Sequence, residues 1–191
     1  MITQHNFTIM SAGKISVLFL QHNITDFEKA SEFVKQIPYG RNDNKKDVST
    51  VFTDHRGTCS TKHALLKELC IENSEPEFKL MLCLFKMNSR NTPSITSLLA
   101  EHKLDYIPEA HNYLKVGTKT IDCTFPKTTL NLYEDEILYE MEISPDQITD
   151  FKVNYHKAYL QKWLKEQRSL SISFEQLWEV REACIASFSM Q

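Results

Sequence analysis

The stretch from Cys59 to Glu72 constrains the fold more than any other part of the sequence. Its apolar residues return at the spacing of an α-helix and cover a wide face of it. They are Ala64, Leu65, Leu66, Leu69 and Cys70. Gly57 allows a sharp turn before this helix, and Thr58 can cap it by accepting a hydrogen bond from a backbone amide. A helix with so wide an apolar face must be buried, so we expect it at the centre of the domain.

Four other apolar stretches predict strands. Each has the length of a strand or the alternation of apolar and polar residues that a strand shows. The stretches are residues 15–20, 79–87, 111–116 with 119–124, and 137–143. The third stretch predicts a hairpin whose loop is Gly117 and Thr118, because glycine at the first loop position suits a type II′ turn. Strands joined by so short a loop are antiparallel, so we expect a small antiparallel sheet.

Capping residues predict the remaining helices. A Ser or Thr followed three residues later by Glu or Gln is a capping box, and this pattern begins at Thr25, Ser144 and Ser173. Thr92 and Pro93 begin another helix. The predicted helices cover about residues 25–37, 94–102, 144–167 and 173–188. No repeat or linker divides the chain, so we expect one α+β domain over 1–191, with a core at about 15–143 and a helical C-terminal extension at about 144–191.

Charge and cysteine content exclude several classes of protein. A net charge of -3 and a pI of about 6.2 give no basic surface for a nucleic acid. The apolar run near the start is too short to cross a membrane, and no basic segment precedes it. The five cysteines are odd in number and widely spaced, which indicates reduced thiols rather than a disulfide framework. We therefore expect a cytoplasmic protein that binds neither a membrane nor a nucleic acid.

Cys59 stands in the first turn of the predicted central helix. The free backbone amides and the positive end of the helix dipole stabilise a thiolate there and lower the pKa of the thiol. A cysteine at a helix start is nevertheless more often structural than catalytic, because reactivity also needs a base.

The predicted hairpin supplies a base and a carboxylate. With Gly117 and Thr118 in the loop, His111 and Asp122 lie on one face of the sheet as diagonal neighbours, roughly 7–8 Å apart between backbones. A carboxylate bound to one imidazole nitrogen fixes the tautomer and leaves the other nitrogen free to take the thiol proton. The alternative is an exposed hairpin with an incidental His–Asp pair. The presence of Cys59 favours the catalytic interpretation.

The strings GTCSTKHALLKEL and AHNYLKVGTKTIDCTFP together resemble the transglutaminase-like superfamily. The resemblance covers about residues 39–126. It implies a papain-like fold, in which a helix bearing the cysteine packs on an antiparallel sheet bearing His and Asp. It also implies that Cys59 is the nucleophile, His111 the general base and acid, and Asp122 the orienting carboxylate. Many members have an aromatic residue, often Trp, two residues after the histidine, where this chain has Tyr113.

By this resemblance we expect a thiol hydrolase or acyltransferase that acts on an amide bond through a thioester, without a cofactor. Its substrate would be a peptide, a protein or a small amide. No tryptophan precedes Cys59 to act as an oxyanion donor, so the Cys59 amide and the Asn42 side chain are the candidates. The alternative is a non-catalytic binding or scaffolding module that keeps the fold. The sequence leaves open the substrate, the choice between hydrolysis and transfer, and the oligomeric state.

A zinc site is a further alternative at the same cysteine. His55, Cys59 and His63 are spaced as i, i+4 and i+8, and zinc accepts such ligands. Because Gly57 and the Thr58 cap place His55 before the helix, the three residues do not share a face, and we predict no metal site. No acidic loop matches a calcium site either. The other histidines have no partner pattern and are expected on the surface: His5, His22, His102 and His156.

Overall fold

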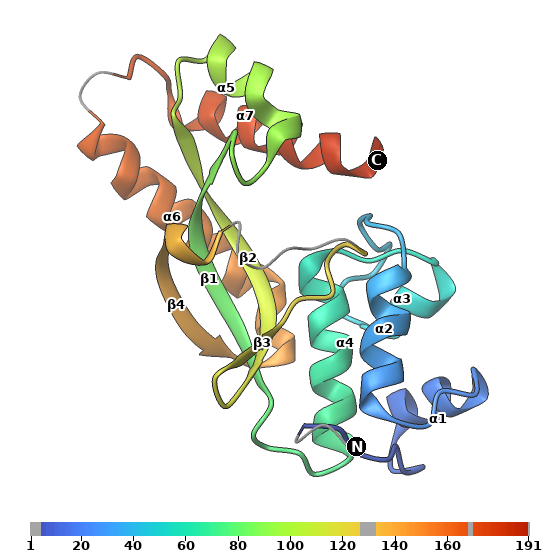
Figure 1. The fold of residues 1–191 in the computed structure, drawn as a ribbon. Helices are drawn as coiled ribbons and strands as arrows, with labels where there is room; N and C mark the ends of the chain where they lie inside the picture. Colours follow the sequence, from blue (N-terminus) through green and yellow to red (C-terminus); the bar gives the residue numbers. More distant parts are fainter. Residues whose placement is uncertain (1–4, 127–132, 168–169, 191) are drawn as a thin grey trace.

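The computed structural model describes residues 5–126, 133–167 and 170–190 and has an α+β fold (Figure 1). Its four-stranded sheet is antiparallel, with the strand order β3-β2-β1-β4. The strands are β1 (Lys79–Asn88), β2 (Tyr106–Val116), β3 (Lys119–Ile121) and β4 (Ile137–Ile143). The predicted α+β class and small antiparallel sheet are therefore confirmed.

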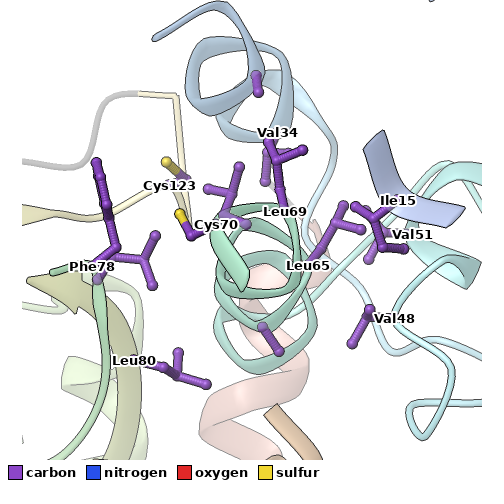
Figure 2. Close-up of a cluster of buried hydrophobic side chains, with 14 of the residues drawn as sticks. Ile15, Val34, Val48, Val51, Leu65, Leu69, Cys70, Phe78, Leu80 and Cys123 are labelled. Atoms are coloured by element: carbon purple, nitrogen blue, oxygen red, sulfur yellow. The ribbon is translucent and has the colours of Figure 1, made fainter. Parts of the chain in front are cut away.

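The helix bearing Cys59 lies at the centre of the N-terminal half. The helices of this half are α1 (Lys14–Gln21), α2 (Phe27–Gln36), α3 (Thr50–Thr53) and α4 (Cys59–Glu72). In Figure 2, Leu65 of α4 lies toward Val51 of α3, and both are fully buried. Leu69 lies toward Val34 of α2, and Phe78 covers the side of α4 that faces the sheet. The bounds and the burial of α4 match the prediction.

The segment at residues 15–20 is a helix, and the prediction of a strand there is wrong. Glu72 at the end of α4 accepts hydrogen bonds from the backbone amides of Ile15 at 2.9 Å and Ser16 at 2.6 Å. This carboxylate satisfies the first amides of α1, whose own N-cap residue, Gly13, makes no side-chain bond. The cap comes from a residue far away in the sequence, so no local signal marks the start of the helix.

The C-terminal helices form a second apolar cluster with the sheet. They are α6 (Asp150–Glu166) and α7 (Phe174–Ala186), with α5 (Thr96–Glu101) beside them (Figure 1). Short 3-10 helices lie at η1 (Pro93–Ile95), η3 (Glu134–Glu136), η4 (Pro145–Ile148) and η5 (Ser187–Met190). Leu160 of α6 and Leu177 of α7 are fully buried in a cluster with Met81 and Tyr113 of the sheet. The helices of the extension at 144–191 thus share a core with the sheet.

The hairpin has the predicted register. Val116 pairs with Lys119 and Leu114 pairs with Ile121, and Gly117 in the loop has the positive φ of 54° that favours glycine. β2 begins earlier than predicted and includes Pro108. Its pairing with β3 stops at Leu114, which leaves one edge of β2 open and allows a residue without an amide hydrogen there.

Two of the three predicted capping boxes are confirmed. Gln147 accepts from the amide of Ser144, and Gln176 accepts from the amide of Ser173, both at 2.9 Å. α2 is instead capped by Asp26, which accepts from the amide of Lys29 at 2.9 Å. Within the described ranges, no helix is both long and apolar enough to cross a membrane.

Candidate active site

Cys59 is the first residue of α4, and only 8% of it is exposed. The Thr58 side chain caps the helix by accepting from the amide of Thr61, and the Thr61 hydroxyl accepts from the amide of Thr58 at 3.0 Å. The amides of Cys59 and Ser60 donate to no acceptor in the described part of the chain. Two free donors therefore remain at the positive end of α4, next to the sulfur.

His111 and Asp122 are brought together by the hairpin. Nε2 of His111 lies 2.9 Å from Oδ2 of Asp122, which directly follows β3. Asp122 also accepts from the amide of Thr124 at 2.9 Å, from its hydroxyl at 2.6 Å, and from the hydroxyl of Tyr133 at 2.8 Å. Burial alone would raise the pKa of Asp122, but His111 and these donors hold it well below its usual range. Asp122 is thus a carboxylate that accepts from His111.

Cys59 and His111 lie close enough that the charge on each shifts the pKa of the other. Because Nε2 of His111 is bound to Asp122, Nδ1 is the nitrogen left for the sulfur. Burial opposes ionisation of the thiol, but Lys152 and His111 outweigh it and lower the pKa of Cys59 to about 6. Burial also opposes a charge on the imidazole, yet Asp122 and Cys59 raise the pKa of His111 to about 10. At neutral pH the two groups are therefore a thiolate and an imidazolium.

The other four cysteines have different surroundings. All five thiols are free and buried. Burial raises the pKa of four of them: Cys70, Cys83, Cys123 and Cys184. Cys59 is the one cysteine of the chain whose surroundings favour a thiolate at neutral pH.

Lys152 is a site residue that the sequence analysis missed. It lies on α6 and is 8% exposed, and its Nζ is 3.6 Å from Sγ of Cys59. The same ammonium donates to Oγ of Ser60 at 2.8 Å and to Oδ1 of Asn112 at 2.7 Å. A signal for it exists in the sequence, because Lys152 falls on the buried face of α6 that also carries Leu160. A lysine on the apolar face of a helix requires a partner in the core.

His63 is fully buried and has two backbone partners. Its Nδ1 donates to the carbonyl oxygen of Cys59 at 2.7 Å, and its Nε2 accepts from the amide of Cys123 at 2.7 Å. Burial lowers the pKa of His63 to about 4, so the ring is neutral at pH 7. His55 is exposed and precedes α4. In the residues that the structure describes, no group of three or more His, Cys, Asp or Glu side chains could hold a metal ion.

Asn42 has a structural role in place of the predicted oxyanion role. Its Nδ2 donates to Oδ2 of Asp54 at 3.1 Å and to the carbonyl oxygen of Arg56 at 2.8 Å. Its Oδ1 accepts from the hydroxyl of Thr61 at 2.7 Å. Both amide hydrogens are thus occupied, and Asn42 ties the segment before α4 to the first turn of the helix.

A buried group of charged and polar side chains lies beside the site. Arg181 of α7 donates through two nitrogens to the carboxylate of Glu109 on β2, with Nε to Oε2 at 2.8 Å. His156 of α6 donates to the carbonyl oxygen of Pro108 at 2.7 Å and is 2% exposed. The predicted surface position of His156 is therefore wrong, because this face of α6 packs against β2.

The described site combines a thiolate, an imidazole held by a carboxylate, two free amides and a buried ammonium. A thiolate beside an imidazolium can attack a carbonyl carbon and protonate the group that leaves. No family model, no curated protein and no solved structure matches the chain. The functional argument therefore rests on the geometry and the chemistry of these residues.

Proposed function

We propose that this chain is a thiol enzyme of the papain-like, transglutaminase-related type, which hydrolyses an amide or transfers its acyl group. One observation carries the proposal: Cys59 and His111 shift each other's pKa toward a thiolate and an imidazolium, while Nε2 of His111 lies 2.9 Å from the buried carboxylate of Asp122. The packing of α4 on an antiparallel sheet that bears the histidine also supports it, since the resemblance implies this arrangement. Each of the three residue types fills a role that this chemistry requires.

In the proposed reaction the Cys59 thiolate attacks the carbonyl carbon of the amide and forms a carbon–sulfur bond. The His111 imidazolium gives its proton to the leaving nitrogen as the carbon–nitrogen bond breaks, and a thioester remains on Cys59. Neutral His111 then takes a proton from water or from an acceptor amine, which attacks the thioester and releases the thiolate. Asp122 holds Nε2 through both halves of the reaction, so that Nδ1 stays toward the reacting atoms.

The negative oxygen of the tetrahedral intermediate needs donors. The amides of Cys59 and Ser60 suit this role, because they are free and lie at the positive end of α4. Asn42 has no part in the proposed reaction, since its amide hydrogens are already bound to Asp54 and Arg56.

The proposal is tested with an amide-like, thiol-reactive probe and intact-mass spectrometry. We expect one adduct on the wild-type protein at neutral pH and none on Cys59→Ala, because Cys59 alone forms a thiolate. Cys184→Ala is the matched control: this thiol is buried in the second apolar cluster, and its loss should leave the labelling rate unchanged. If Cys59 reacts no faster than Cys123, or if Cys59→Ala is labelled like the wild type, the enzyme proposal fails and the scaffold alternative gains support.

A further inference from the structure

The buried ammonium of Lys152 has no carboxylate partner within the described ranges. None of the ion pairs among these residues includes Lys152, although other buried charges nearby are paired, such as Arg181 with Glu109. Placing an ammonium in a protein interior costs several kcal/mol unless a negative charge compensates it. A compensating charge for Lys152 would therefore come from a group other than a carboxylate.

The three acceptors around Lys152 identify that group. Asn112 donates through Nδ2 to the carbonyl oxygen of Met81 at 2.9 Å, which fixes its amide with Oδ1 toward the lysine. Ser60 donates its own hydroxyl hydrogen to the same Oδ1 at 3.0 Å, so its lone pairs face Lys152. These two acceptors are neutral and the third is the sulfur of Cys59, so the sulfur alone can carry the compensating charge.

We propose that Lys152 is a further catalytic residue, the permanent counter-ion of the Cys59 thiolate, and that it assists the release of the thiolate from the thioester. This inference rests on the proposed function. When His111 has given its proton to the leaving amine, the imidazole is neutral and Lys152 is the remaining cation beside the sulfur. In the thioester the sulfur is neutral and the ammonium has lost its counter-ion. Attack by water or an amine breaks the carbon–sulfur bond and returns its electron pair to the sulfur. The Cys59 thiolate and the Lys152 ammonium then form an ion pair again.

Other charged or titratable groups around this pair come from every neighbouring element. They include Lys62 and His63 on α4, Cys83 on β1, His111 and Glu109 on β2, Asp122 after β3, His156 on α6, Arg181 on α7, and Tyr39 and Lys45 before α3. Glu109 is neutralised by Arg181, and Asp122 is bound to His111. Neither carboxylate is therefore free to compensate Lys152.

The test measures the rate of Cys59 alkylation by iodoacetamide from pH 4 to pH 9. We expect the wild-type rate to be half-maximal at about pH 6. In Lys152→Met the midpoint should rise by about one unit or more, so that the rate at pH 6 falls about fivefold or more. Lys152→Arg keeps the charge and should keep the midpoint near that of the wild type. Lys162→Met is the matched control, because it makes the same change on an exposed part of α6.

The outcomes separate this inference from the proposed function. An unchanged midpoint in Lys152→Met, with labelling still abolished in Cys59→Ala, would overturn the role of Lys152 and leave the enzyme proposal intact. A wild-type Cys59 that reacts no faster than Cys123 would remove the basis of both. Urea unfolding accompanies each variant, and Lys152→Met should stay folded because Asn112 Oδ1 still accepts from Ser60 and the Cys59 thiolate can bind a proton once the ammonium is lost.

Discussion

Two buried lysines lie close to the start of α4, and their surroundings differ in kind. Lys62 is fully buried, and its ammonium meets only backbone oxygens. It donates to the carbonyls of Ile37 at 2.5 Å, Cys123 at 3.3 Å and Thr124 at 2.9 Å. Lys152 instead meets side chains, and one of them is the sulfur of Cys59.

The difference separates Lys62, which has a structural role, from Lys152, which has a role in the proposed reaction. Lys62 joins three segments that are distant in the sequence: α4, the residues after α2 and the residues after β3. Carbonyl oxygens accept hydrogen bonds but do not react, so the hydrogen bonds of Lys62 hold these segments together, and its charge acts on Cys59 and Asp122 only through space. Lys152 lies against the sulfur of Cys59, whose charge changes during the proposed reaction. Burial alone therefore does not reveal what a lysine does, whereas its acceptors do.

The largest expected effect is on stability in Lys62→Met. The substitution leaves three buried carbonyl oxygens without their donor, and each such loss costs about 1–3 kcal/mol. We expect the free energy of unfolding in urea to fall by about 3 kcal/mol or more. Lys152→Met should lose less stability, because Asn112 Oδ1 still accepts from Ser60 and the Cys59 sulfur can bind a proton. Equal losses in the two variants would mean that both lysines are structural.

The next largest effect is a loss of stability at acid pH, and it comes from His63, which lies next to Lys62 in α4. The pKa of His63 is lowered to about 4 by burial, below the value of about 6.5 in an unfolded chain. Between these values the unfolded state binds more protons, so stability falls as the pH drops from 6.5 to 4. The loss is on the order of 3 kcal/mol from this residue. The free energy of unfolding in urea should fall less between pH 7 and pH 4.5 in His63→Gln than in the wild type. An equal fall would contradict the lowered pKa of His63.

A smaller effect is expected at Cys59 in Asp122→Asn. In Ser-His-Asp triads the corresponding change costs about 10⁴-fold in rate. We expect about a tenfold loss in the alkylation rate at pH 6, because Lys152 still stabilises the thiolate when the imidazole binds its proton less tightly. Asp122→Asn combined with Lys152→Met should lose more than the product of the two single losses. A loss of about 500-fold in the single variant would correspond to a thiol with its ordinary pKa of 9.0 and would show that Lys152 contributes nothing.

The smallest effect is expected in Tyr133→Phe. The change removes one of the donors to Asp122 and leaves the bond to His111 in place. We expect a loss of about 1 kcal/mol in unfolding free energy. The midpoint of Cys59 alkylation should stay within about half a pH unit of the wild type, since the remaining donors keep the carboxylate charged.

The positions of Cys59, His111 and Asp122 follow from local sequence signals. Thr58 marks the start of α4, and this places Cys59 in the first turn. Gly117 marks the hairpin loop and so fixes which residues of β2 and β3 lie opposite each other. Capping and turn signals act over a few residues, which is why they can be read in a single sequence.

The features that were missed depend on contacts between distant segments. α1 is stabilised by Glu72, and this cap exists only after α4 has packed beside it. Lys152 reaches Cys59 only when α6 lies against β2, and the packing of whole helices leaves no short motif. The burial of His156 has the same origin. For the candidate site, the sequence therefore indicated Cys59, His111 and Asp122 but not the ammonium of Lys152 beside them.

The separation of 93 positions in the sequence between Cys59 and Lys152 has a consequence for the synthesis of the protein. While a ribosome is still making the chain, α4 and the hairpin exist before α6 does. A Cys59 thiol without its ammonium has a higher pKa and exposes less thiolate, which is the form that oxidants and electrophiles attack. Under the proposed role of Lys152, the nascent chain carries a less reactive cysteine. The nucleophile becomes fully charged only when the last third of the protein has folded onto the sheet.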